Sequence, residues 1–217
     1  MGHRGGTPMR GKAYHTYGYG NQRDYPLADD KYAIEQLADR YPFINGKKVG
    51  MYGHSGGGFM ATAAICTYPD FYKAAVSSSG NHDNNIYNRG WVEIYNGVQE
   101  STKTIQTATG KDSIIYTFSS HVPTNMELAK NLKGHLLLVS GDQDRNVHPA
   151  HLLRMANALI QANKNFEMLL IPGAKHGYTG QANRFFEKKL WFHFAKYLLG
   201  DFSSEQFTDL DETLKIK

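Results

Sequence analysis

The stretch Gly53-His54-Ser55-Gly56-Gly57 puts a serine in a glycine turn between a predicted strand and a predicted helix. Residues 48–52 before it are a short extended run, and the small and apolar residues 59–65 after it are typical of a helix. Such a turn strains the serine backbone, and glycines on either side avoid steric clashes. The Ser55 hydroxyl would project from the end of the strand, with the Gly56 N–H aimed at a developing oxyanion. We therefore interpret Ser55 as a nucleophile, against the alternative of an incidental serine in a surface turn.

The composition is that of an ordinary soluble globular protein. The chain has 217 residues, of which 41% are hydrophobic and 20% are charged. This length suffices for one sizeable core, so we expect residues 1–217 to form a single domain, with 201–217 as a polar tail. The net charge is +4, but the lysines and arginines are scattered, which argues against a nucleic-acid partner. No apolar run approaches about 18 residues, so no membrane span is predicted.

The sequence leaves the cellular compartment open. Residues 1–6 lack the apolar segment of a signal peptide, yet the start of the chain looks cut, so export remains a possibility. A periplasmic or extracellular location is our working guess, with the cytoplasm as the alternative. The single cysteine, Cys66, cannot form an internal disulfide and is expected to be a small core residue.

Predicted strands and helices alternate along the chain, which favours a mostly parallel sheet with helices on both faces. Good strand candidates are the segments 48–52, 74–78, 136–139 and 166–171. Helices are expected over 29–41, 59–65, 125–131, 149–162 and 183–199. Residues 1–27 are expected to form a long loop, and 98–122 a loop or small hairpin. A polar cluster at 80–85 follows the second strand, where ligand sites of open parallel sheets lie.

Three chemically competent residues follow successive predicted strands in the order Ser55, Asp144, His176. A histidine has a pKa near 6.5, so it can accept the serine proton and later donate it to a leaving group. An aspartate would fix the imidazole tautomer and stabilise the imidazolium. The same order is found in α/β-hydrolases.

Alternatives to this triad stay open. Asp142 competes with Asp144, and either could simply cap the helix that follows. His148 and His151 could suggest a metal pair, but no third ligand is sensibly spaced. We expect no metal and no cofactor.

The motifs together resemble the catalytic domain of the prolyl oligopeptidase family, in particular its dipeptidyl peptidase IV branch in bacterial form. They are Arg4-Gly5-Gly6, Asp30, the glycine turn at 53–58, the pattern Gly141-x-x-Asp144-x-x-Val147-His148, and His176-Gly177. The resemblance implies an α/β-hydrolase fold and a serine peptidase that acts on peptides. It would release dipeptides ending in proline or alanine through an acyl-enzyme on Ser55.

The resemblance also implies a substrate pocket. Tyr87 and Trp91 match two pocket tyrosines of the branch, and Tyr95 matches a further aromatic. Asn146 matches an asparagine that binds a substrate carbonyl, and Val147 matches a pocket wall. A flat aromatic floor suits the compact, apolar proline ring. The alternative is that the three aromatics, spaced by four, form the buried face of a helix.

Two departures from the family pattern stand out. Gly56 replaces an aromatic that usually follows the nucleophile, which keeps the N–H but removes a pocket wall. The first four strands, the propeller domain, the tyrosine that is the second oxyanion donor, and the glutamates that hold the substrate amino terminus have no counterpart. We expect a partial α/β-hydrolase fold whose nucleophile strand is an edge. This edge would pair with a second copy, be covered by residues 1–27, or require the missing N-terminal propeller segment. The functional alternatives are an acylaminoacyl peptidase, a carboxylesterase, or a catalytically impaired fragment with weak esterase activity at most.

Overall fold

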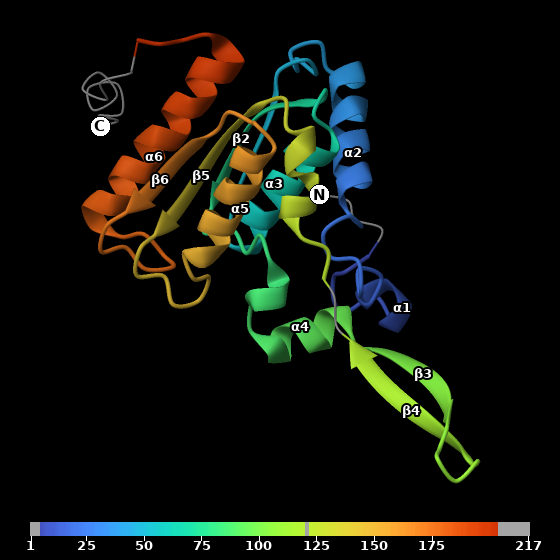
Figure 1. The fold of residues 1–217 in the computed structure, drawn as a ribbon. Coiled ribbons are helices and arrows are strands. Elements are labelled where there is room, and N and C mark those ends of the chain that lie inside the picture. Colours follow the sequence, from blue (N-terminus) through green and yellow to red (C-terminus); the bar gives the residue numbers. More distant parts are fainter. Residues whose placement is uncertain (1–4, 120–121, 204–217) are drawn as a thin grey trace.

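A four-stranded parallel sheet forms the centre of the computed structural model, which describes residues 5–119 and 122–203 (Figure 1). Its strand order is β1-β2-β5-β6, and all three neighbouring pairs are parallel. The strands are β1 (Val49–His54), β2 (Tyr72–Ser78), β5 (His135–Gly141) and β6 (Glu167–Ile171). The four strands predicted from the sequence are therefore the four strands of the sheet.

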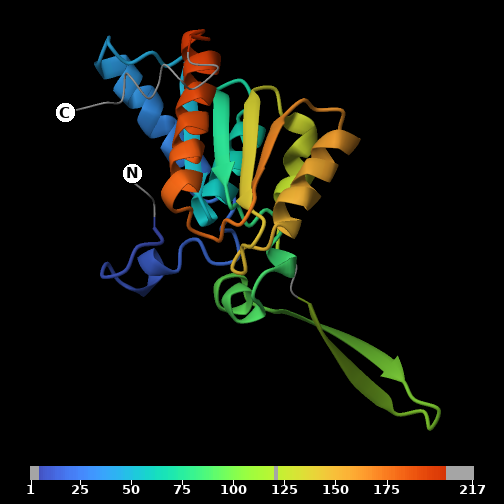
Figure 2. The ribbon, with the colours of Figure 1, turned by 90° about the vertical axis from the view of Figure 1, so that its left-hand side faces the viewer.

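Helices cover both faces of the sheet, as Figure 2 shows. One face carries α2 (Leu27–Arg40), α3 (Gly56–Thr67), the 3-10 helix η2 (Asn125–Asn131) and α5 (Ala150–Gln161). The other face carries α6 (Gly180–Phe194), which continues as the π-helical turn η3 (Ala195–Leu199). The predicted α/β architecture, with helices on both faces of a parallel sheet, is confirmed.

Residues 136–139 of the central strand β5 are all apolar because both faces of this strand are buried. Leu136 and Leu138 point into the core beneath α3 and α5, whereas Leu137 and Val139 point into the core beneath α6. A strand buried on both faces needs apolar residues at every position. Cys66 is also fully buried, on α3.

Helix α3 lies very close to β2. A Cβ atom at Gly58 would come within 2.6 Å of the Ser78 carbonyl oxygen, so any larger residue would push the helix away from the sheet. This close packing fixes the start of α3 relative to the ends of β1 and β2, where the candidate nucleophile lies.

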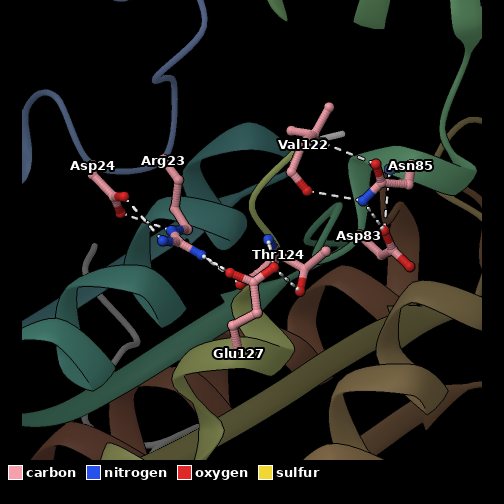
Figure 3. A network of polar contacts seen from close by, with 7 residues as sticks. All are labelled: Arg23, Asp24, Asp83, Asn85, Val122, Thr124 and Glu127. Atoms are coloured by element: carbon pink, nitrogen blue, oxygen red, sulfur yellow. Dashed lines mark hydrogen bonds and ion pairs between the residues drawn. The ribbon is translucent and has the colours of Figure 1, made fainter. Parts of the chain in front are cut away.

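The N-terminal segment, expected as a loop, contains one short helix, α1 (Lys12–His15), within its described part. Arg23 links this segment to the start of η2, as Figure 3 shows. Its guanidinium bonds the Asp24 carboxylate at 2.7 and 2.9 Å, the Thr124 carbonyl at 2.7 Å and the Glu127 carboxylate at 3.2 Å. Glu127 in turn accepts the Thr124 N–H at the start of η2. Arg4, one of the motif residues, lies outside the described residues, as does 204–217 of the expected tail.

The segment after β2 folds into the short 3-10 helix η1 (Asn84–Ile86) and then α4 (Arg89–Asn96). Asn85 ties this segment to the chain before η2 (Figure 3). Its Nδ2 donates to the Val122 carbonyl at 2.8 Å, and its Oδ1 accepts the Val122 N–H at 2.9 Å. These two bonds hold the loop after β2 in place on the carboxyl side of the sheet.

Of the loop or small hairpin expected over 98–122, the structure shows a hairpin, and a long one. Strands β3 (Gln99–Gln106) and β4 (Asp112–Ser119) pair along their whole length. Figures 1 and 2 show the ribbon projecting away from the body. The sequence did not indicate its length, because residues 98–122 are rich in threonine and serine and show little hydrophobic periodicity. None of the helices within 5–119 and 122–203 is both long and apolar enough to cross a lipid bilayer.

Strand β1 is an edge strand among the described residues, as the sequence predicts. A groove of about 1010 Å³ runs beside it, between β1 and the end of α6. Gly50, Phe194 and Leu198 line this groove, and a Cβ at Gly50 would come within 2.7 Å of the Phe194 ring. Part of the apolar surface of this edge is therefore covered by α6 itself.

Two buried histidines should make the fold sensitive to mild acid. Burial lowers the pKa of His82 to about 3 and that of His151 to about 4. Above pH 6.5 both rings are neutral in the folded and unfolded chains. Below pH 6.5, the two histidines bind protons in the unfolded chain but stay neutral in the folded chain. The free energy of unfolding therefore falls as pH decreases toward 4.

We expect the two rings together to contribute a slope of up to about 2.7 kcal/mol per pH unit between pH 6.5 and 5. Urea denaturation across this range would measure it. His82→Gln should remove up to half of this contribution, whereas His15→Gln on α1 is the matched control outside the core. An unchanged slope in His82→Gln would contradict the prediction.

Candidate active site

The turn between β1 and α3 has the strained geometry expected for a nucleophile. Ser55 has φ 59° and ψ −123°, which few non-glycine residues adopt. Its N–H donates to the Ser78 carbonyl at 2.8 Å, which ties the turn to β2. A Cβ at Gly53 would lie 2.3 Å from the backbone of Gly57, so position 53 requires glycine. A Cβ at Gly57 would meet nothing, which corrects the expectation that Gly57 is needed for space.

A continuous chain of hydrogen bonds links the three candidate residues. His176 Nε2 lies 3.0 Å from Ser55 Oγ, and His176 Nδ1 lies 2.8 Å from Asp144 Oδ2. An ionised carboxylate can only accept, so Nδ1 carries the proton and Nε2 is left to accept the serine proton. The loops after β1, β5 and β6 thus bring together residues that are far apart in the sequence.

Asp144 is held in place by three donors. Its side chain is fully buried, and its Oδ1 accepts the N–H groups of Asn146 and Val147, each at 2.9 Å. Asp142 points elsewhere and accepts the Gly173 N–H at 2.6 Å on the exposed surface. Of the two aspartates that the sequence left in competition, Asp144 is the one that contacts His176.

One polar group beside His176 was not predicted from the sequence. His54, the residue before Ser55, bonds Ser78 Oγ through Nδ1 at 2.9 Å, and Ser78 Oγ also contacts the Tyr178 hydroxyl at 3.0 Å. The His54 and His176 rings lie 4.8 Å apart. Burial, and then the nearby His176, lower the pKa of His54. His54 is therefore biased toward its neutral form beside the reacting histidine. Its place inside the Gly-x-Ser-x-Gly turn was the only signal available in the sequence.

The predicted pocket aromatics do not share one helix face. Trp91 lies on α4, but Tyr87 precedes the helix and caps the end of η1. The alternative, in which all three aromatics form the buried face of one helix, is therefore wrong, because Asn88 caps α4 and the helix begins only after Tyr87. The two rings still meet edge to face at 5.5 Å. The Tyr87 hydroxyl donates to Asn146 Oδ1 at 2.9 Å, which joins the aromatic segment to the loop of Asp144.

Tyr95 packs between α4 and the N-terminal segment, and Val147 is buried beside Asp144. Tyr95 contacts Trp91 at 5.1 Å and Tyr19 at 5.7 Å, and its carbonyl accepts the Gly20 N–H. It therefore joins α4 to the N-terminal segment. Val147 is buried, at 2% exposure, directly beside the Asp144 carboxylate.

A cavity of about 420 Å³ opens beside the glycine that follows the candidate nucleophile. Gly56 and Gly57 form one side of it, and Trp91, Met60 and Asn81 form others. Gly56 is the first residue of α3, so its N–H has no acceptor within the helix and is available to an oxyanion. A second cavity, of about 440 Å³, lies at the Tyr87 side and reaches Phe118 at the base of the ribbon.

His148 and His151, which the sequence offered as a metal pair, each accept a backbone N–H. His148 Nδ1 accepts the Ala150 N–H at 3.1 Å, and His151 Nδ1 accepts the Asp83 N–H at 3.3 Å. Among the residues that the structure describes, no three histidine, cysteine or acidic side chains come close enough to hold a metal ion.

Comparison with known proteins assigns the family. Residues 1–202 match the prolyl oligopeptidase family. The chain belongs to this family. Its fold is the α/β-hydrolase fold that the sequence predicted.

Proteins similar to this prolyl oligopeptidase family member include several named dipeptidyl peptidases, one of which is named as inactive. Human dipeptidyl peptidase 8 is 28% identical over 150 residues, which cover 69% of this chain and 16% of that protein. Mouse inactive dipeptidyl peptidase 10 is 25% identical, over 73% of this chain and 19% of that protein. The crystal structure of Porphyromonas gingivalis dipeptidyl peptidase 4 matches with a TM-score of 0.71 at 24% identity, over 88% of this chain and 25% of that one. The chain thus spans a quarter or less of each of these proteins.

Proposed function

We propose that this chain carries the catalytic site of a serine dipeptidyl peptidase that releases Xaa-Pro or Xaa-Ala dipeptides from peptide amino termini. The observation that carries the proposal is the unbroken chain from Asp144 through His176 to Ser55 at a strained turn. The names of the relatives and the aromatic side chains near the nucleophile support the dipeptidyl specificity.

The proposed chemistry follows from the positions of the donors and acceptors. Ser55 Oγ attacks the carbonyl carbon of the second substrate residue while His176 Nε2 takes the serine proton. The resulting oxyanion accepts the Gly56 N–H. The C–N bond then breaks as His176 gives its proton to the leaving amine, which leaves an acyl-enzyme on Ser55. Water deprotonated by His176 attacks the ester and releases the dipeptide.

Asp144 and Asn146 have supporting roles in this proposal. Asp144 holds Nδ1–H and stabilises the imidazolium that forms in each half-reaction. Asn146 Nδ2 is free to turn toward a substrate carbonyl because its Oδ1 already accepts the Tyr87 hydroxyl.

Three substrates separate the proposed function from its alternatives. The purified protein is assayed with Gly-Pro p-nitroanilide, N-acetylalanine p-nitroanilide and p-nitrophenyl acetate. A dipeptidyl peptidase releases p-nitroaniline from the first compound, whose amino terminus is free, whereas an acylaminoacyl peptidase releases it from the second, in which one acetylated residue precedes the anilide. Ester hydrolysis alone indicates a carboxylesterase or an impaired fragment. Absence of Ser55 labelling by a fluorophosphonate would overturn the catalytic assignment altogether.

Trp91 should matter for proline-containing substrates in particular. It lines the cavity beside Gly56, so Trp91→Ala removes packing against the substrate ring. We expect kcat/KM for Gly-Pro p-nitroanilide to fall tenfold to a few hundredfold, from a loss of about 1–3 kcal/mol, with a smaller loss for p-nitrophenyl acetate. The other tryptophan, Trp191 on the exposed side of α6, offers the matched control Trp191→Ala. Equal losses on both substrates would mean that Trp91 only supports the fold.

A further inference from the structure

The last residue of β2, Ser78, contacts both the turn of the candidate nucleophile and the loop of His176. Its carbonyl oxygen accepts the Ser55 N–H at 2.8 Å. Its hydroxyl lies 2.9 Å from His54 Nδ1 and 3.0 Å from the Tyr178 hydroxyl. His54 directly precedes Ser55 in the sequence, and Tyr178 lies two residues after His176. Ser78 therefore connects, through hydrogen bonds, the two loops that must stay in register for the serine and the histidine to meet.

The aromatic rings of this connection pack on one another and on the catalytic candidate. The His54 ring lies 4.8 Å from the His176 ring and 5.8 Å from the Tyr178 ring. The Tyr178 ring packs in turn on Phe186 of α6 at 5.0 Å, beside the core beneath that helix. Ser78, at the centre, is 1% exposed, so water cannot easily replace its hydroxyl contacts. The polar connection is thus anchored at both ends by packing.

The Asp144 carboxylate holds His176 through one ring nitrogen only. A single contact at Nδ1 fixes one point of the ring and leaves the ring free to swing about that point. The His176 side chain is also 26% exposed, so the surrounding protein does not enclose it completely. Proton transfer requires Nε2 to stay within hydrogen-bond reach of Ser55 Oγ, and a displacement of about 1 Å can cost about 10²-fold in rate. A second support for the histidine loop therefore has a direct effect on turnover.

We propose that His54 is a positioning residue for His176, and that it holds the histidine loop against the nucleophile turn through Ser78 and Tyr178. The inference deepens the proposed function and rests on it in that His176 is the base for Ser55. His54 acts through the loop and not on the substrate. Its loss should therefore lower kcat with little change in KM, which is the signature of an interaction needed only in the transition state.

Two hydroxyl deletions test the connection at its centre and at its far end. Ser78→Ala removes the central hydroxyl but leaves the carbonyl that accepts the Ser55 N–H. Tyr178→Phe removes the other hydroxyl and keeps the ring that packs on Phe186. We expect each to lower kcat on p-nitrophenyl acetate by about 10- to 100-fold, with KM within about twofold of the wild-type value. The double variant should lose much less than the product of the two effects, because both changes break the same connection.

Two substitutions at His54 separate its hydrogen bond from its ring. His54→Asn places an amide atom where Nδ1 lies, so the bond to the Ser78 hydroxyl can still form. His54→Phe keeps a ring beside His176 but carries no polar atom. We expect His54→Asn to retain most of kcat and His54→Phe to lose as much as Ser78→Ala. The reverse order would overturn the inference, because ring packing alone would then explain the role of this residue.

Ser77, the neighbouring buried serine of β2, provides the matched control. Its hydroxyl donates to the Gly58 carbonyl at 2.8 Å, and its side chain lies on the opposite face of the strand from that of Ser78. Ser77→Ala therefore removes a buried hydrogen bond of the same strand and should lower thermal stability, but it should leave kcat close to the wild-type value. Equal losses of kcat in Ser77→Ala and Ser78→Ala would overturn the inference.

Two further measurements do not require a good substrate. The rate at which a fluorophosphonate labels Ser55 should fall in Ser78→Ala, because labelling needs the aligned histidine. The far-downfield proton resonance of the His176 Nδ1–H, which is bonded to Asp144, should broaden or vanish in the same variant. A ring that swings away from the carboxylate exposes this proton to exchange with water.

These measurements separate the inference from the proposed function. Refusal of Gly-Pro p-nitroanilide, with the effects on ester turnover and labelling retained, would reject dipeptide release and support the role of His54. Wild-type kcat, labelling and resonance in His54→Phe would overturn the inference even if dipeptides are released. If Ser55 proves unreactive in the wild-type protein, the resonance alone decides. Tyr178→Phe takes the place of Ser78→Ala should the latter fail to fold.

Discussion

Ser55→Ala should reduce kcat by about 10³–10⁶-fold, because the proposed acyl-enzyme forms on the Ser55 hydroxyl. His176 would keep its bond to Asp144, but its Nε2 would have no proton to accept from a nucleophile. Binding should change far less than turnover, since Ser55 Oγ is a small part of the contact surface. The measurement is kcat and KM on p-nitrophenyl acetate and on the best anilide, together with fluorophosphonate labelling.

The matched control for this variant is Ser101→Ala on the exposed ribbon, which should keep wild-type activity and labelling. Circular dichroism should show that Ser55→Ala is folded, because the Ser55 N–H bond to β2 is made by the backbone and survives the change. If Ser55→Ala retained most of its activity, Ser55 could not be the nucleophile, and the whole triad assignment would fall.

Asp144→Asn should lower kcat by about 10⁴-fold while leaving the fold intact. The asparagine oxygen can still accept the N–H groups of Asn146 and Val147. Its amide nitrogen, however, would donate to His176 Nδ1 and so drive the proton onto Nε2. In that tautomer Nε2 cannot accept the Ser55 proton, and the imidazolium loses its buried negative partner.

Asp142→Asn is the control in the same loop, because Asp142 bonds Gly173 on the surface rather than the histidine. It should leave kcat close to the wild-type value. Comparable losses in the two variants would mean that the loop conformation, and not the Asp144–His176 contact, controls activity. Kinetics on p-nitrophenyl acetate suffice for this comparison, because the test does not depend on the substrate pocket.

Local patterns in the sequence determined the strands and helices of this protein and the turn at the candidate nucleophile. The apolar run 136–139 and the alternation of strand and helix predicted four parallel strands, because burial on both faces leaves no position for a polar residue. The Gly-x-Ser-x-Gly stretch predicted the turn at Ser55, because a strand followed directly by a helix holds the serine in a strained backbone conformation with positive φ. Such features depend on neighbours within a few residues.

Other features of the site depend on contacts between segments that are distant in the sequence. The tertiary structure decides these features. Asp142 and Asp144 are equivalent in sequence, and only the loop after β6 selects Asp144 by bringing His176 to it.

The walls of the cavity were decided in the same way. The polarity of 80–85 indicated a ligand site in general terms, but not which amide would be buried beside Gly56. Asn81 became a wall of the cavity because β2 ends next to α3, whose close approach at Gly58 sets the position of both. The sequence determined which groups are available for chemistry, and the packing of helix against sheet determined which of them meet.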